Sequence, residues 1–427
     1  MKLGELIEIK HGYAFSGEHI VEDDNGIVLV TPGNFRIGGG FKEEKCKFFD
    51  GEIPADYVLK EGDFIVTMTD LSKTIDTLGY SALVPKSKRI YLHNQRIGLV
   101  TFKSDECDRG YIYWLMRTRE YQRSIANTST GATVHHTSPK KIYDYDLEVP
   151  PLPIQHRIAN ILSRYDSLIE NYQKQIKLLE EAAQRLYKEW FVDLHFPGHE
   201  NTKIVDGVPE GWEKKPALDF FEMSIGRTPP RTQKQWFTKG SNGIPWVSIS
   251  DMKDTMFVQE TAEELTQDAC ENYNIKVIPK GTILLSFKLT VGRVAFAGAD
   301  VCTNEAIAHF QKEGDEWKAY TLMYLRNYNY DSLGNTSGIS KAVNSTIIKN
   351  MPFVMPCTAI LQEFSQRVLP FIKQTENLQS QLRLLTEARD RLLPKLMSGE
   401  LTLEARAEKE DLLATPCKRG WEEDEAK

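Results

Sequence analysis

Few residues of this chain combine the side-chain types and spacings that catalysis requires. Gly38, Gly39 and Gly40 form a glycine run, but they lack the spacing to Gly-Lys-Ser/Thr of a phosphate loop, so a flexible turn is expected. His135 and His136 are adjacent and would face opposite ways in a strand, and no cysteine or carboxylate stands at ligand spacing from them. The sequence therefore predicts no metal site, no cofactor and no catalytic residue.

The carboxylates give the same indication. Asp70, Asp76, Asp251 and Glu305 form no spaced pair with a nearby lysine, which a nuclease site would need. An Asn/Asp-Pro-Pro-Tyr/Phe motif is also missing, because residues 149–152 read Val-Pro-Pro-Leu and introduce a helix. We therefore expect a protein that is not itself an enzyme.

Length and composition limit the remaining classes. The 427 residues are too many for one ordinary core and indicate two or three domains. The net charge of −7 argues only mildly against nucleic acid, because residues 400–427 contribute nine acids and five bases while basic groups lie elsewhere. Six cysteines without CxxC spacing indicate reduced thiols that bind no metal. Without a signal-like or membrane-spanning run, the protein is expected to be cytoplasmic.

Two long amphipathic helices organise the chain. Apolar residues recur at spacings of three and four from Ile154 to Trp190, with charges between them, and the pattern returns from Leu361 to Leu396. Such narrow seams favour pairing with another helix, and the first helix would span on the order of 50 Å. The seam includes Ile158, Tyr165, Tyr172, Leu179, Leu186, Leu378, Leu385 and Leu392.

The helices also share a sequence. The pattern Leu-Leu-x-Glu-Ala-x-x-Arg-Leu occurs at residues 178–186 and again at 384–392, an offset of 206. Two unrelated surface helices would explain each stripe but not the offset. We therefore predict that the two helices pair with each other as a coiled coil.

Each helix follows a globular segment, and the two segments match. Residues 1–150 alternate short β-type runs with turns and include an expected helix from Tyr111 to Ile125 and an expected last strand at residues 145–149. Residues 199–357 repeat this order. Gly281 stands 219 positions after its counterpart Gly62, and Gly338 stands 207 positions after Gly131. Ordered offsets that drift slowly mark an internal repeat of about half the chain.

The predicted architecture is α+β, with two similar domains joined by two long helices. The expected parts are a first domain (1–150), a first helix (151–198), a second domain (199–357), a second helix (358–402) and an acidic, disordered tail (403–427). Antiparallel pairing of the helices would give a pseudo-twofold dumbbell. The two heads would then lie roughly a helix length apart, ~50 Å at most. At that separation they could lie on one face of a DNA duplex, whose grooves repeat every ~34–36 Å. A protein–protein scaffold could have the same shape.

The ordered motifs resemble the specificity subunit of type I restriction–modification systems. The resemblance covers residues 1 to about 402, and no single motif is unique. The segments that carry it are IPWVSISDM (244–252), PKGTILLSF (279–287), CTNEAI (302–307), PPLPIQ (150–155) and LPKLMSGEL (393–401). Residues 67–73 depart from the matching residues 286–293, so the first head belongs to another recognition subtype.

The resemblance implies a function as an adaptor. Each repeat would be a target recognition domain, and the protein would read a bipartite target in double-stranded DNA. Two methyltransferase subunits would bind the helical spacer, and endonuclease/translocase subunits would join through the complex. The partner would methylate adenine at N6 with S-adenosylmethionine.

Loops at corresponding places in the two heads are expected to contact the DNA. Arg and Lys suit guanine, Asn and Gln suit adenine, and Lys, Arg, Ser and Thr suit phosphates. In the first head we predict contacts from Asn34, Arg36, Lys73, Thr74, Asn94, Arg96, Thr133 and His135. In the second head we predict contacts from Arg227, Arg231, Lys253, Lys288, Arg293, Asn304, Ser337 and Lys341. Ordinary capping or surface roles are the alternative for each residue, and for Asn94 and Asn304 in particular a structural turn.

Two alternatives to the adaptor remain at this point. One is an orphan specificity module that is not tied to restriction. The other is a two-headed coiled-coil scaffold that does not bind DNA.

Overall fold

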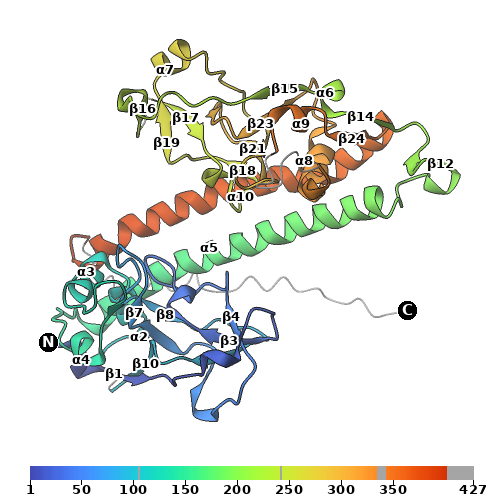
Figure 1. The fold of residues 1–427 in the computed structure, drawn as a ribbon. Coiled ribbons are helices and arrows are strands. Elements are labelled where there is room, and N and C mark those ends of the chain that lie inside the picture. Colours follow the sequence, from blue (N-terminus) through green and yellow to red (C-terminus); the bar gives the residue numbers. More distant parts are fainter. Residues whose placement is uncertain (104–105, 241–242, 334–342, 402–427) are drawn as a thin grey trace, which may run out of the picture. The chain divides into compact units, whose positions relative to one another are not determined.

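The computed structural model describes residues 1–103, 106–240, 243–333 and 343–401. The chain divides into two compact units, Met1–Leu168 with Thr386 onward, and Ile169–Leu385 (Figure 1). Each long helix contributes one stretch to each unit. The predicted tail (403–427) lies outside the described residues. Within the described part of the chain, no helix is long and apolar enough to cross a membrane.

The first unit has two larger sheets and a short ribbon. One sheet has the strand order β1-β10-β6-β8, the second β2-β4-β3-β9-β5, and β7 pairs with β11. The strands are β1 (Ile7–His11), β2 (Ile20–Val21), β3 (Ile27–Val30), β4 (Lys47–Phe49), β5 (Val58–Leu59), β6 (Phe64–Thr67), β7 (Thr69–Asp70), β8 (Ser81–Leu83), β9 (Ile90–His93), β10 (Ile97–Phe102) and β11 (His135–His136). The short helices are α1 (Leu3–Leu6), α2 (Arg109–Leu115), α3 (Arg119–Asn127) and α4 (Pro139–Tyr143).

The second unit repeats this plan. Its sheets have the orders β15-β23-β20-β21-β18 and β16-β19-β17-β22, with the pairs β12-β13 and β14-β24 beside them. The strands are β12 (Ile204–Val205), β13 (Val208–Pro209), β14 (Glu213–Pro216), β15 (Glu222–Ile225), β16 (Phe237–Thr238), β17 (Ile244–Val247), β18 (Phe257–Val258), β19 (Glu263–Leu265), β20 (Ile283–Ser286), β21 (Val294–Ala297), β22 (Cys302–Thr303), β23 (Ile307–Gln311) and β24 (Pro352–Met355). The short helices are α6 (Ala217–Phe220), α7 (Gln267–Asn272), α8 (Lys318–Asn327) and α9 (Ser345–Lys349).

The two sheet orders correspond strand by strand. In sheet order, β1, β10, β6 and β8 match β15, β23, β20 and β21. The parallel pair β3–β9 matches the parallel pair β17–β22, with Val30 opposite His93 and Val247 opposite Thr303. The predicted α+β class with two similar domains is therefore confirmed.

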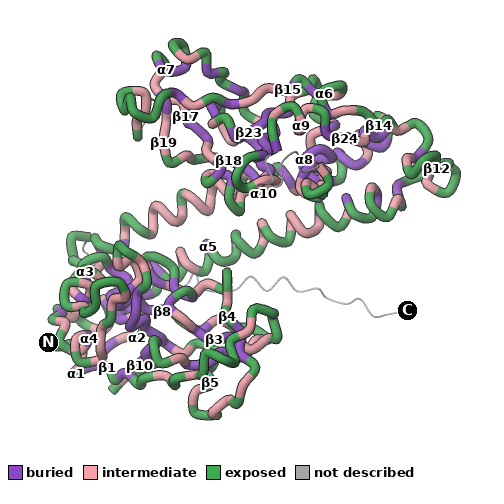
Figure 2. The backbone as a smooth tube through the Cα atoms, viewed as in Figure 1, coloured by how far each residue is buried: buried purple, intermediate pink, exposed green. Residues whose placement is uncertain are grey.

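The long helices are α5 (Leu152–Tyr187), which continues as a π-helical turn to Val192, and α10 (Thr358–Met397). In the first unit, Leu162 of α5 and Leu393 of α10 belong to the same buried cluster as Trp114. In the second unit, Tyr187 and Phe364 share a buried cluster with Phe310. Within each unit, therefore, a stretch of α5 and a stretch of α10 contribute to one core. Figure 2 marks the buried residues of each unit in purple.

Two local predictions are wrong. The helix expected from Tyr111 to Ile125 is two helices, because the Thr118 side chain accepts a hydrogen bond from the backbone N–H of Tyr121 and starts α3. The strand expected at residues 145–149 forms only an isolated bridge between Lys2 and Asp146.

Candidate nucleic-acid interface

In the second unit, the candidate contacts gather at the carboxyl end of the parallel strands β17 and β22. Asn304 directly follows β22, and its backbone N–H donates to the Val247 carbonyl at 3.0 Å. Its side-chain oxygen accepts from the Ala306 backbone N–H at 3.0 Å. Asn304 therefore shapes its own turn, and it does so at the edge where loops from several strands meet.

A glycine brings the next loop against this turn. The backbone N–H of Arg227 donates to the Thr303 carbonyl at 2.9 Å. A Cβ on the preceding residue, Gly226, would lie 2.0 Å from Thr303 Oγ1 and 2.2 Å from the Asn304 carbonyl oxygen. Only glycine allows this approach. The Arg227 guanidinium is exposed and donates to the Tyr273 carbonyl at 3.4 Å.

Arg231 lies in the same loop and is already engaged. Its guanidinium stacks 4.5 Å from the ring centroids of both Phe237 and Trp246. It also donates to both carboxylate oxygens of Glu263, at 2.8 and 2.7 Å. Both bonds come from the same nitrogen, Nη1, and the residue is half exposed, so the two rings and the carboxylate together hold the guanidinium at the surface.

The loop between β20 and β21 completes the cluster. The Phe287 N–H donates to the Ala306 carbonyl at 2.9 Å, which ties this loop to the turn of Asn304. Lys288 is exposed, whereas Arg293 is half-buried and donates to the Ile249 carbonyl at 2.7 Å. The cluster is thus held by main-chain bonds and presents cations from two loops.

The pKa of Glu305 reflects the positive charges around it. Its partial burial alone would raise the pKa of this carboxyl. The hydrogen bond from Thr228 and the positive charges of Lys288 and Arg231 outweigh that effect and lower the pKa. Lys288 and Arg231 are therefore close enough to Glu305 to act on it together.

The structure does not place the three remaining candidates of the second unit in this cluster. Lys253 is exposed and forms an ion pair of 3.7 Å with its neighbour Asp254. Ser337 and Lys341 lie outside the described residues.

The first unit builds the equivalent turn. Asn94 follows β9, and its side-chain oxygen accepts from the Arg96 N–H at 3.1 Å. A Cβ on Gly12 would lie 2.1 Å from the Asn94 carbonyl oxygen, as for Gly226 and its turn. The Met68 N–H donates to the Arg96 carbonyl at 2.9 Å, which repeats the bond from Phe287 to Ala306. The two turns are therefore built by the same contacts.

Asp70 organises the loop that carries Lys73 and Thr74. One carboxylate oxygen accepts from the Ser72 N–H at 2.6 Å, and the other accepts from the Thr77 N–H at 2.6 Å and its hydroxyl at 2.8 Å. Burial alone would raise the pKa of Asp70, but these hydrogen bonds outweigh it and lower the pKa. Lys73 is exposed, while Thr74 donates to Asp76.

The β11 hairpin lies beside this loop. His135 is paired with Asp70 in the β7–β11 ribbon, and the Thr69 hydroxyl lies 3.1 Å from Nδ1 of His136. Thr133, in the hairpin, is exposed. The structure therefore groups Lys73, Thr74, Thr133 and His135 around one ribbon.

Asn34 does not have the position that a base contact requires. Only 1% of it is exposed, and its oxygen accepts from the Thr31 N–H at 2.9 Å while its amide donates to the Lys42 carbonyl at 3.2 Å. Asn34 therefore stabilises the loop in which it lies. In the second unit Asp251 does the same, because its carboxylate accepts a hydrogen bond from the Ser248 backbone N–H. Arg36 remains at the surface, where it donates to the Phe41 carbonyl and pairs with Glu44 at 3.5 Å.

Sequence reasoning missed the residues that shape these loops. Gly12, Gly226 and Asp70 carry no chemistry of recognition themselves, yet they fix the turns that do. The two glycines stand at equivalent places, because Gly12 directly follows the edge strand β1 and Gly226 directly follows the edge strand β15. No comparable signal marks Leu289, which is 99% exposed at the β20–β21 turn.

The predicted helix seam is only partly buried. Ile158 and Leu378 are buried, with 3% and 2% exposed. The six others are intermediate, and of these Leu186 and Leu392 pack against the cores of their own units. The six are Tyr165, Tyr172, Leu179, Leu186, Leu385 and Leu392.

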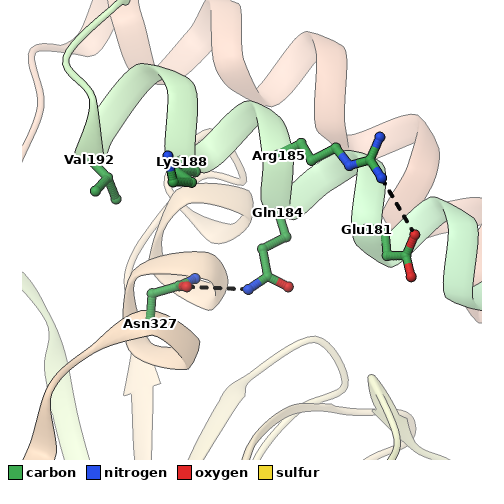
Figure 3. Close-up of a pocket in the computed structure, with 6 residues that line it drawn as sticks. All are labelled: Glu181, Gln184, Arg185, Lys188, Val192 and Asn327. Atoms are coloured by element: carbon green, nitrogen blue, oxygen red, sulfur yellow. Dashed lines mark hydrogen bonds and ion pairs between the residues drawn. The ribbon is translucent and has the colours of Figure 1, made fainter. Parts of the chain in front are cut away.

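A hollow on the second unit offers no alternative site (Figure 3). Gln184 of α5 donates to Asn327 of α8 at 3.3 Å, and Arg185 pairs with Glu181 at 3.9 Å. The hollow is lined by Glu181, Gln184, Arg185, Lys188, Val192 and Asn327.

Two cysteines lie together in a buried cluster of the second unit. Cys270 and Cys302 lie side by side with their sulfurs 3.4 Å apart, although their sequence positions are remote. Burial raises the pKa of both thiols, which makes them unreactive. No three metal-binding side chains converge among the described residues.

Comparison with known proteins identifies the class. The family model for the type I restriction modification DNA specificity domain matches residues 1–181 and 209–386. The chain therefore belongs to this family, and each match covers one copy of the repeat.

Named relatives narrow the class further. The chain is 28% identical over 306 residues to the type I restriction enzyme MjaIX specificity subunit of Methanocaldococcus jannaschii, which covers 69% of each protein. It is 22% identical to the EcoBI specificity subunit of Escherichia coli, over 97% of this chain and 88% of that one. The fold matches the crystal structure of a type I S subunit from M. genitalium with a TM-score of 0.60 at 15% identity, covering 93% of this chain and 95% of that one.

Proposed function

We propose that this protein is the DNA sequence-specificity subunit of a type I restriction–modification enzyme. The observation that carries the proposal is the duplicated turn. Gly12 against Asn94 and Gly226 against Asn304 form the same close approach in the two copies of the family domain. Each copy would present its loops to one half of a bipartite DNA target.

The side chains on the two sets of loops differ, which is why the half-targets would differ. The first copy presents Lys73 and Thr74 from the connection after β7, with His135 on β11 beside it, and the second copy presents Lys288 from the corresponding connection between β20 and β21. Different donors and acceptors select different base edges. A bipartite, asymmetric target follows from two diverged copies of one scaffold.

The protein would act as an adaptor for catalytic partners. Two adenine-N6 methyltransferase subunits would bind the long helices, and restriction endonuclease/translocase subunits would join through the complex. The duplicated helix motif supports this, because its first leucine is exposed in both copies. Leu178 of α5 is 63% exposed and Leu384 of α10 is 54% exposed.

Methylation mapping of the host with the gene present and deleted tests the proposal. Deletion should remove one bipartite N6-methyladenine motif, and replacing residues 1–150 by another first domain should change one half of that motif only. Unchanged methylation, together with no salt-dependent duplex binding by the purified complex, would contradict DNA recognition. A change in both halves after the swap would contradict one domain for each half.

A further inference from the structure

Leu289 has an unusual position for a leucine. It lies in the turn between β20 and β21, its side chain is 99% exposed, and its backbone φ is +59°. Left-handed backbone is disfavoured for residues with a Cβ, and it is rare for a bulky apolar residue. Exposed leucines are common by themselves, but one held in this conformation needs a cause.

The base of the turn imposes that conformation. Ser286 is fully buried, and its hydroxyl donates to the Thr290 carbonyl at 2.6 Å and accepts from the Arg293 N–H at 3.0 Å. Main-chain bonds from Ser286 to Arg293 and from Gly292 to Ser286, both of 2.9 Å, close the turn. These hydrogen bonds therefore fix the backbone of the turn, on which the leucine side chain is exposed to solvent.

The neighbourhood of Leu289 is the cluster of candidate DNA contacts. Lys288 precedes it, and the turn is tied through Phe287 and Ala306 to Asn304. Lys288 and Arg231 both act on Glu305 from this side. An exposed apolar side chain next to Lys288 suits a ligand that combines phosphates with flat apolar surfaces.

The first unit has a similar feature in the corresponding connection. Leu71 follows β7 and is 59% exposed, and Ile75 of the same loop has a φ of +54°. The two connections differ in length and sequence: Lys288 directly precedes Leu289, whereas Lys73 stands two residues after Leu71. The first unit thus also exposes a leucine near a lysine, although the residue with left-handed backbone in its loop is Ile75 and not Leu71.

We propose that Leu289 packs against the bases of the half-target read by the second unit. This inference rests on the proposed function. Leucine can contact the thymine methyl group in the major groove or act as a wedge at a base step. Both contacts bury the apolar side chain against the bases, and a fixed turn backbone lowers the cost of ordering the side chain on binding.

The test uses the complete complex with its methyltransferase subunits and the duplex found by methylation mapping. Leu289→Ala and Leu289→Gly should weaken binding to that duplex on the order of 10- to 100-fold, because the burial of one leucine is lost. Binding to an unrelated duplex should not change. Leu289→Met should keep most of the affinity.

The glycine variant separates binding from folding. Glycine adopts a positive φ without penalty, so Leu289→Gly should leave the melting temperature unchanged or higher while affinity falls. A leucine with a structural role would lower both. Leu218→Ala is the matched control, since Leu218 is 46% exposed on α6 of the same unit.

Two modified duplexes identify the contact. Replacing thymine by uracil in the half-target should abolish the difference between wild type and Leu289→Ala if the methyl group is the partner. A rise in 2-aminopurine fluorescence that requires Leu289 would instead show a wedge. Wild-type affinity in Leu289→Ala and Leu289→Gly would overturn the inference and leave the proposed function standing, whereas a wild-type complex that ignores the mapped duplex would contradict the proposed function.

Discussion

Asp166 of α5 and Arg389 of α10 form a short ion pair, with Oδ1 of the carboxylate 2.6 Å from Nη1 of the guanidinium. The other carboxylate oxygen pairs with Arg117 at 2.5 Å. Arg117 is 5% exposed, and its guanidinium lies 4.2 Å above the ring of Trp114. One carboxylate therefore joins both long helices to the core of the first unit.

Removing this carboxylate should destabilise the first unit. Asp166→Ala removes the carboxylate that pairs with the Arg117 guanidinium, whose side chain is only 5% exposed. It also removes one of the two carboxylates that pair with Arg389, which keeps Asp390 at 2.7 Å. Breaking a buried pair on one side costs about 3–5 kcal/mol. Urea unfolding of the variant should show a loss of that order.

The control for Asp166 lies on α10. Glu363 pairs with Arg367 one helical turn away at 2.7 Å, and both side chains are largely exposed. Glu363→Ala should cost well under ~1 kcal/mol, as surface pairs do. Equal losses in the two variants would contradict the role of Asp166 as a buried junction.

Gly12 allows a second test, this time of the turn geometry. In Gly12→Ala, the new Cβ would meet backbone atoms of Asn94 at 2.1 and 2.3 Å, which no side-chain rotation can relieve. We expect a loss of about 1–3 kcal/mol in stability from the overpacking and a displaced Asn94 turn. Chemical unfolding measures the first effect, and affinity for the first half-target measures the second.

Gly17→Ala is the companion variant in the same unit. A Cβ at Gly17 meets nothing within 4 Å, and its φ is not positive. Stability and DNA affinity should remain near those of the wild type. A Gly12→Ala variant that behaves like Gly17→Ala would show that the close approach is not required.

The sequence was most informative where a pattern repeated. The offset between Leu178 and Leu384 and the matching order of motifs predicted two equivalent units and two long helices, because a duplicated core must satisfy the same packing twice. The start of α3 after Thr118 was missed, since a single capping side chain decided it.

Site residues were harder to predict for a physical reason. Asn34 has the chemistry of an adenine contact, yet its amide satisfies buried backbone groups of its own loop. Whether a polar side chain faces solvent or its own turn depends on local geometry that composition does not carry. Leu289 was missed because the sequence around a single leucine does not indicate whether its side chain is buried or exposed.

His309 should make the stability of the second unit depend on pH. Burial, and to a lesser degree Lys276, lowers its pKa to about 4, while Ser224 and Thr303 hold the neutral ring at 2.8 and 2.7 Å. The ordinary pKa of about 6.5 applies to the unfolded chain, which therefore binds more protons between these values. Stability is full above pH 6.5 and falls by about 3 kcal/mol as the pH drops to 4.

Unfolding measured at several pH values checks this prediction. His309→Gln removes the titrating group, so the variant should lose part of the pH dependence between 6.5 and 4 even if it is less stable throughout. Parallel curves for wild type and variant would show that His309 does not cause the acid sensitivity.

Lys288 should contribute to DNA affinity through its charge, so that its contribution depends on the salt concentration. A lysine that neutralises one phosphate adds about 0.9 to the slope of log K against log salt, so Lys288→Ala should reduce that slope by about one. The loss should be similar for target and unrelated duplexes. Lys215→Ala is the control, because Lys215 is exposed on β14 and pairs with Glu213 at 2.8 Å. A slope unchanged by Lys288→Ala would place this lysine outside the DNA interface.

Leu178 and Leu384 should each anchor one copy of the same partner. Both are the first residue of the repeated helix motif and both are exposed, so neither is needed for packing within the chain. Glutamate at either position should leave the melting temperature near that of the wild type, while it introduces a charge into an apolar contact with the partner.

Native mass spectrometry of the assembled complex measures the result. Leu178→Glu and Leu384→Glu should each reduce two methyltransferase subunits per chain to one, and the double variant should retain none. Leu218→Glu, at another exposed leucine of the second unit (46% exposed), should keep both. Retention of two copies by both single variants would contradict docking on these helix faces, since the duplicated motif would then serve no contact outside the chain.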